Sequence, residues 1–181
     1  LLSNAQQKNI KLPTRYIYPL ISAANFKQNP PVPERWVFLP YTKDGRPLSN
    51  AEKEADPLLK AYLDQHEAQL RARKGVLIQS AIQKGAWWAL LGVGAYNFAA
   101  CKVVWEAYGK STFRPQVFEG RWQANQSLQA CMPFSEGAEA ARVQALLAEG
   151  SVEAYLRSLR MAGAMNWAQP GKIRALLTLT E

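Results

Sequence analysis

The chain has 181 residues, 48% of them hydrophobic and 20% charged, with a net charge of +8. This hydrophobic share suits one compact domain or two small lobes and excludes a wholly disordered chain. No apolar run reaches the roughly 20 residues that cross a bilayer, so we expect no membrane contact. The polar run after Leu2 is not typical of a signal peptide. Because the chain does not start with Met, we expect it to be a fragment of a longer protein.

The cysteine content argues against disulfides and metals. Cys101 and Cys131 are the two cysteines of the chain, and they supply neither a disulfide framework nor a zinc site. Free thiols are usual in a reducing compartment, so we expect a cytoplasmic location.

The positive charge is concentrated in two regions. Residues 1–50 hold seven Lys or Arg against two acids, and residues 71–126 hold eight against two. Residues 51–70 are acidic, with two cations against five acids, and residues 127–181 balance at five each. Such localised basicity is typical of a surface that faces phosphates. The alternative is an ordinary basic protein with scattered solvated lysines.

The first 50 residues are expected to form an entry segment with a strand. Leu12 to Tyr18 is β-branched and aromatic, which favours a short extended piece. Residues 25–33 are expected to form a loop, because the three prolines within them cannot donate to a strand ladder. Trp36 to Leu39 is expected to be a strand, followed by a turn at Lys43 to Arg46.

Residues 51–75 are expected to be helical. Ser49 and Glu52 have the spacing of a capping box, and Asp56-Pro57 offers an N-cap followed by proline at the first helical position. Leucines recur from there at helical intervals until Gly75 ends the segment. His66, the one histidine, is expected to be a surface or hydrogen-bonded residue.

The rest of the chain is expected to be a β-rich core over 76–134 and a helical part over 135–181. The expected strands are Ala86–Leu91, Ala100–Trp105, Gln116–Phe118 and Leu128–Met132. Helices are expected over 139–148 and 152–161, with Gly150-Ser151 as stop and N-cap. The predicted fold class is therefore α+β, a mixed short-stranded sheet bracketed by helices with a helical C-terminal third.

No motif for catalysis or cofactor binding is complete. Asn29-Pro30-Pro31-Val32 lacks the aromatic fourth residue of the adenine methyltransferase motif, and Gly92-Val93-Gly94 lacks a third glycine. Gly109 to Thr112 resembles the end of a Walker A motif without its first glycine. With His66 as the one histidine of the sequence, we propose no Ser-His-acid triad. We therefore expect no catalytic residue, cofactor or metal in this chain.

The segment from Lys84 to Arg114 interleaves aromatic residues, glycines and cations, which is typical of a surface that binds a polyanion. Arg and Lys suit phosphates or guanine edges, Asn and Gln suit adenine edges, and Ser and Thr suit phosphate or sugar. The candidate DNA-binding residues are Arg73, Lys74, Lys84, Lys102, Lys110, Ser111, Thr112, Arg114, Asn125 and Gln126. We expect Lys102, Lys110 and Arg114 to share a face with part of the Arg73-Lys74 pair.

Structural alternatives exist for these candidates. Most of the aromatic residues can form the core of a sheet. Cations at the end of a helix can complement its dipole without a ligand, which is as good an explanation of Arg73 and Lys74. Asn125 and Gln126 can make turn or strand-end hydrogen bonds.

Several short motifs resemble the C-terminal target-recognition domain of TaqI-like DNA adenine-N6 methyltransferases. In that family a helix ending in arginines precedes a Trp-bearing strand, an aromatic loop and a Lys-Ile/Val-Val strand. The corresponding runs are Leu70–Gly75, Trp87-Trp88, Tyr96–Phe98, Lys102–Trp105, Trp122–Leu128, Leu146–Tyr155 and the entry segment Leu12–Leu39, which includes the strand before Pro40. Residues 148–150 depart from the Asn-Ser turn that the family has there.

The resemblance implies a non-catalytic specificity module of a restriction-modification or phage-defence enzyme. A separate N-terminal domain of the same chain would bind S-adenosylmethionine and carry the methyltransferase motif, and double-stranded DNA would be the partner. A protein-interaction module with exposed tryptophans as hot spots is the alternative. A free-standing enzyme is third, because the sequence offers few groups with which to build an active site.

Overall fold

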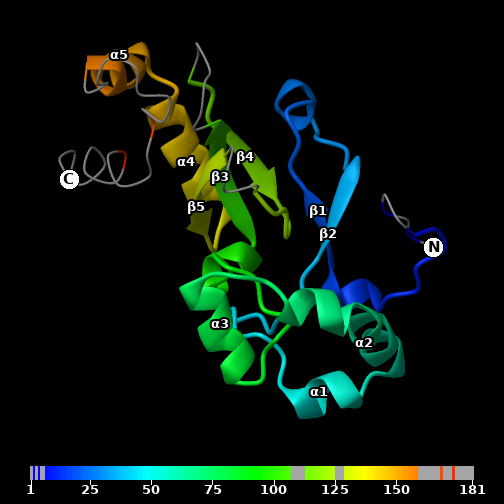
Figure 1. Ribbon diagram of the computed structural model, residues 1–181. Coiled ribbons are helices and arrows are strands. Elements are labelled where there is room, and N and C mark those ends of the chain that lie inside the picture. The colour runs from blue at the N-terminus through cyan, green and yellow to red at the C-terminus, as the bar shows by residue number, and fades with distance from the viewer. Residues whose placement is uncertain are drawn as a thin grey trace. The chain divides into compact units, whose positions relative to one another are not determined.

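The computed structural model describes Leu2, Asn4, residues 7–106, 113–124 and 129–158, Ala168 and Ile173. These residues form an α+β fold with five α-helices and two small antiparallel sheets, which confirms the expected class (Figure 1). The chain divides into two compact units, each made from two separate segments. Unit 1 comprises Leu1–Tyr18 and Trp36–Ala95, and unit 2 comprises Pro19–Arg35 and Tyr96–Glu181. In the described part of the chain, no helix combines the length and apolar character needed to cross a membrane.

The first two helices of unit 1 begin where their caps predict. Helix α1 spans Asn50–Glu54, and its capping box is formed: the Ser49 hydroxyl accepts from the Glu52 N–H, while the Glu52 carboxylate accepts from the Ser49 N–H. Helix α2 spans Pro57–Arg71, and the Asp56 carboxylate accepts the N–H groups of the two residues that follow the proline. Each cap satisfies amide donors that have no partner inside the helix.

The next part of unit 1 differs from the expectation. Residues 76–134 were expected to be β-rich, but they open with helix α3, Val76–Gln83. The strand expected over Ala86–Leu91 is wrong, because the chain makes turns there. Trp87 and Trp88 are both 2% exposed. Adjacent residues of a strand point to opposite faces, whereas a turning chain can bury both indoles in one core.

The core of unit 1 packs these two indoles against the inner face of α2. Its buried members are Leu48, Leu59, Leu63, Trp87 and Trp88, with Tyr16, Phe38, Leu70 and Ile82 partly buried around them. The rings of Trp87 and Trp88 lie 5.1 Å apart at 81°. This edge-to-face geometry is favourable for aromatic pairs.

The two strands of the smaller sheet connect the units along the chain. The piece expected to be extended over 12–18 is partly a 3-10 turn at Thr14–Tyr16, after which strand β1 spans Ile17–Leu20 and pairs with β2, Arg35–Phe38. The loop between them is in unit 2 and is fixed by the fully buried Asn25. Its amide accepts from the Ser22 N–H and donates to the Val32 carbonyl, each at 2.8 Å.

The larger sheet forms the centre of unit 2. Strand β3, Cys101–Glu106, lies between β4, Gln116–Glu119, and β5, Gln129–Phe134, with both pairs antiparallel. All three strands begin within one residue of where the sequence places them. Residues 101–105 are buried without interruption, as in a strand that is covered on both faces.

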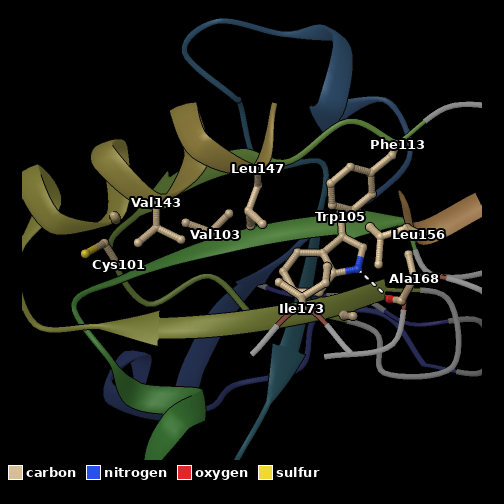
Figure 2. Packing of buried hydrophobic residues seen from close by; sticks show 11 residues of the cluster. Cys101, Val103, Trp105, Phe113, Val143, Leu147, Leu156, Ala168 and Ile173 are labelled. Carbon is tan, nitrogen blue, oxygen red and sulfur yellow. Dashed lines mark hydrogen bonds between the residues drawn. The ribbon is translucent and has the colours of Figure 1, made fainter. Parts of the chain in front are cut away.

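Helices cover one face of this sheet. Helix α4, Gly137–Leu147, directs Val143 and Leu147 toward Val103 and Trp105, as Figure 2 shows. The Trp105 indole N–H donates to the Ala168 carbonyl at 2.7 Å. Helix α5 follows as Gly150–Ser158. Gly150 is thus its first residue, and the expected N-cap at Ser151 is wrong.

The opposite face of the sheet is covered by the loop that unit 2 receives from the N-terminal part of the chain. Val104 and Phe118 pack there with Ile21 and Trp122. Phe26, from the same loop as Ile21, meets the Phe118 ring edge-on at 5.5 Å between centroids. Alternation along β3 therefore assigns Val103 to the helix-covered core and Val104 to the loop-covered core.

The turn expected at Lys43 to Arg46 is present, and it explains two glycines. Gly45 has φ +83°, a conformation that L side chains rarely adopt. A Cβ built on Gly45 would lie 2.2 Å from the backbone carbon of Gly94. Gly94 therefore belongs to a close backbone approach within unit 1.

We predict that Gly45→Ala lowers the free energy of unfolding by about 2–5 kcal/mol, from left-handed strain together with the steric clash. Chemical denaturation measures the change. Gly150→Ala is the control, because a Cβ there meets nothing within 4 Å, and we expect no loss of stability. Equal stability of the two variants would contradict the close approach.

Candidate nucleic-acid interface

The carboxylates of α1 and α2 are occupied by cations of their own unit. Asp64 binds both Lys53 and Lys60, and Glu67 binds Arg71 at 2.6 Å. The ammonium of Lys53 also lies 5.2 Å and 5.6 Å from the Trp87 and Trp88 ring centroids. Burial acts to lower the Lys53 pKa, but hydrogen bonds and charge interactions with Asp64 and Glu54 raise it above its usual value. The acidic run of the sequence is thus largely neutralised locally.

Beyond Glu67 the chain contains no Asp or Glu until Glu106. Five cations fall in this acid-free segment: Arg71, Arg73, Lys74, Lys84 and Lys102. The structure gives them different surroundings. Arg71 is paired with Glu67 and lies over the Trp87 ring at 5.4 Å.

Arg73 does not have the exposed position expected of a phosphate contact. It is half-buried, and its guanidinium donates to the carbonyls of Leu70, Ala89 and Trp87 at 2.9, 2.8 and 2.6 Å. These bonds tie the end of α2 to the segment that carries both indoles. Arg73 therefore has a structural role in this arrangement, and its assignment as a DNA contact stays a prediction.

Lys74 and Lys84 are the exposed cations of the acid-free segment. They flank α3, with Lys74 before the N-cap Gly75 and Lys84 at the C-cap. Within the described residues, no ion pair or side-chain hydrogen bond engages either ammonium. An eight-residue helix is about 12 Å long, so the two ammonium groups can stand about one major-groove width apart.

Helix α3 exposes a mixed surface between these lysines. Ile78 is buried, while Val76 and Leu77 are 86% and 70% exposed. Gln79 donates its amide to the Arg73 carbonyl, and Gln83 is exposed. Sequence reasoning missed α3. The i, i+4 spacing of Ile78 and Ile82 after Gly75 was the signal that could have identified it.

Lys102 also lacks the exposed position that its assignment as a DNA contact requires. Its side chain is 1% exposed, on the loop-covered side of β3, and its ammonium donates to the Ala99 carbonyl at 3.3 Å. Burial lowers the pKa of Lys102 to about 8. No ion pair to a described carboxylate compensates for this. Lys102 cannot reach a phosphate from this position, and it cannot share an exposed face with the other candidates.

Of the six remaining candidate DNA-binding residues, the structure describes one. Arg114 is exposed in unit 2, where no described partner binds it. Lys110, Ser111, Thr112, Asn125 and Gln126 lie outside the described residues. The expectation that Lys110 and Arg114 share a face with Lys74 therefore stays a prediction.

A buried amide pair next to these positions went unrecognised. Asn97 and Gln123 are 8% and 3% exposed, and the Asn97 amide donates to the Gln123 side chain at 3.0 Å. The Gln123 amide donates to the Asn97 carbonyl at 2.7 Å. The Gln123 backbone meanwhile bonds with Pro19 and Ile21. This pair anchors the N-terminal loop to unit 2.

Most tryptophans are not available to a partner. Among the five described tryptophans, Trp36 is 53% exposed and Trp87, Trp88, Trp105 and Trp122 are buried. The described residues also contain no group of three or more His, Cys, Asp or Glu that could hold a metal ion.

The chain was compared with protein-family models, curated proteins and solved structures, and none of the three comparisons gives a match.

The buried ammonium of Lys102 predicts a pH effect. The folded-state pKa is lowered from 10.5 to about 8, so the unfolded chain binds more protons between these values and stability due to Lys102 rises with pH. We predict that Lys102→Met is more stable than the parent at pH 7. This advantage should shrink by on the order of 3 kcal/mol toward pH 10.5.

Chemical denaturation of both proteins across this pH range measures the difference. The buried thiols of Cys101 and Cys131, whose pKa values burial raises, oppose the trend but are common to both proteins. A difference that does not change with pH would show that Lys102 is not buried as an unpaired ammonium.

Proposed function

We propose that the chain is a sequence-specific DNA recognition module of a DNA adenine-N6 methyltransferase, itself non-catalytic. The observation that carries the proposal is the acid-free segment in which Lys74 and Lys84 flank an exposed helix. Ammonium groups bind the backbone phosphates of DNA whatever its base sequence, and this binding releases counterions. A pair of such groups can therefore position a module on a duplex.

Within this proposal, α3 is the described element best suited to meet the duplex. Lys74 and Lys84 bind backbone phosphates, and the amide of Gln83 between them offers the paired donor and acceptor that match an adenine edge. Arg114 adds a cation from unit 2. Lys110, Ser111, Thr112, Asn125 and Gln126 keep the phosphate, sugar and base roles that the sequence suggests for them.

The catalytic partner in this proposal is a domain of the same chain that precedes Leu1. That domain binds S-adenosylmethionine and carries the Asn-Pro-Pro-aromatic motif, whereas Asn29 to Val32 ends in an aliphatic residue. The proposed module closes on DNA and helps to present an extruded adenine. It belongs to a restriction-modification or phage-defence enzyme.

A protein-interaction module is the second candidate, and Trp36 favours it. This exposed indole lines an apolar cavity of about 600 Å³ in unit 1 together with Leu58 and Ile10. An exposed tryptophan beside an apolar hollow is a common hot-spot arrangement. Trp36→Ala would abolish such an interaction and leave DNA binding intact.

The DNA proposal predicts a specific salt dependence. Lys74→Gln and Lys84→Gln should each reduce the slope of log K against log salt for duplex DNA by about 0.9, the loss of one phosphate contact. Fluorescence anisotropy at several salt concentrations measures the slope. Lys60→Gln is the control, since it removes the same charge from an ammonium already bound to Asp64.

The control slope should equal that of the parent protein. If all three variants change the slope equally, the effect is one of net charge and the proposed role of α3 is wrong.

A further inference from the structure

A small cavity within unit 1 is lined mainly by aromatic residues, and two of its lining residues carry a buried polar atom without a hydrogen-bond partner among the described residues. Its volume is about 190 Å³, and its walls are Phe38, Pro40, Tyr62, Leu63, His66, Gln69, Leu70, Trp88 and Leu90. The indole Nε1 of Trp88 and the imidazole Nε2 of His66 are buried, and neither has a hydrogen-bond partner in the described part of the chain. This pair is unusual, because buried polar groups are nearly always satisfied.

Leaving these atoms unsatisfied is costly. A buried donor or acceptor without a partner costs about 1–3 kcal/mol, and Trp88 is 2% exposed. His66 was expected to be a surface or satisfied histidine, and its Nε2 is neither. Two residues that carry such atoms belong to the walls of one cavity, which points to a place that can receive a polar molecule.

The aromatic walls are held rigidly. Tyr62 meets His66 at 4.7 Å between ring centroids and Phe38 at 5.4 Å, both edge-to-face. The Tyr41 hydroxyl donates to the Leu90 carbonyl at 3.1 Å and accepts from the Leu90 N–H at 2.6 Å. With Arg73 fixing the carbonyls on either side of Trp88, the indole is pre-organised, which lowers the entropy cost of binding.

The size and charge of the cavity restrict its occupant. Two water molecules take up about 60 Å³ at liquid density, so the cavity is larger than two bridging waters need. It is smaller than the pockets of drug-sized ligands, which start at about 300 Å³. No lysine, arginine or carboxylate is among its described walls, so a charged molecule would lose its hydration without compensation.

The polar atoms define the edge that the occupant must present. An indole N–H can only donate, so it requires an acceptor. His66 Nε2 donates or accepts according to tautomer, so it matches either kind of neighbouring group. The aromatic walls favour a planar π system. An uncharged planar ring with acceptor and donor groups along one edge is the chemistry of a nucleobase.

We propose that this cavity, between α2 and the Trp87–Leu90 segment, binds a single unpaired nucleobase. The base is held by hydrogen bonds to Trp88 Nε1 and His66 Nε2 and by contact with the rings of Phe38 and Tyr62. It can come from a free nucleoside or from a nucleotide extruded from a nucleic acid. The proposal does not require the lysines that flank α3.

The experiment uses the signals of the intact chain in nuclear magnetic resonance. His66 is the one histidine of the sequence, so its imidazole signals are assigned without mutagenesis. The Trp88 indole signal is the one that disappears in Trp88→Phe. Adenosine and thymidine are the first probes, and a duplex with one unpaired adenine or thymine is the second, with the fully paired duplex for comparison.

The expected result is that one of these probes shifts the His66 Nε2 and Trp88 Nε1 signals together, while the indole of the exposed Trp36 does not move. His66→Phe keeps a planar ring but removes the polar atom, and it should weaken binding about tenfold. Gln65→Phe, on the exposed side of α2, is the matched control and should bind as the parent does.

The probes also separate the sources of the base. A response to nucleosides indicates a free ligand, and a response confined to the unpaired-base duplex indicates an extruded one. If neither probe moves the two signals, the proposal is overturned. It is also overturned if both atoms still exchange magnetisation with trapped water at a saturating probe concentration, because water then occupies the cavity in place of a base. The salt-dependence test of the DNA proposal depends on Lys74 and Lys84, whereas this test depends on His66 and Trp88. Either proposal can therefore fail without the other.

Discussion

The guanidinium of Arg73 determines how the centre of unit 1 is arranged. Because residues 86–91 turn instead of pairing in a sheet, their carbonyls lack the partners that a ladder would supply, and buried carbonyls need partners. Arg73 supplies two of them and also closes the end of α2. A planar fork with several fixed donors can do this, whereas the point charge of a lysine cannot. The positions of both indoles follow from it.

The charged side chains before and after the end of α2 differ in whether they are paired with an opposite charge. On α1 and α2 the carboxylates bind nearby cations and leave little net field at the surface. Past the end of α2 no carboxylate follows in the sequence until Glu106, and no described carboxylate pairs with the lysines at the ends of α3. Lys102 belongs to the same acid-free segment but lies in the interior of unit 2. Charge along the sequence therefore overstates the charge that a ligand can meet.

Local signals in the sequence were reliable and tertiary ones were not. The caps of α1 and α2 and the strands of the larger sheet could be predicted, because side-chain caps and β-branched runs act over a few residues. Helix α3 was missed because it is short and starts at a glycine without a side-chain cap. The segment 86–91 was misassigned because its aromatic composition favours strands, while long-range bonds from Arg73 and Tyr41 hold it in turns.

The candidate site was predictable to a similar degree. The exposed positions of Lys74 and Lys84 could be predicted from residue type alone, since lysines are mostly exposed. Arg73 and Lys102 could not, because a cation in the sequence gives no indication that its donors will face carbonyls or a core. The unsatisfied atoms of His66 and Trp88 depend on distant segments meeting, which no spacing in the sequence reveals.

The interleaving of the two units also has a consequence for synthesis on the ribosome. Ile21 and Phe26 pack against β3 and β4, which are made much later. At about 5–20 residues per second, these apolar side chains wait on the order of 4–16 s for their partners. Asn25 meanwhile can close the loop around them through its own local bonds. Since neither unit is a continuous stretch of chain, no single truncation isolates one, and any cut between residues 19 and 95 removes part of both.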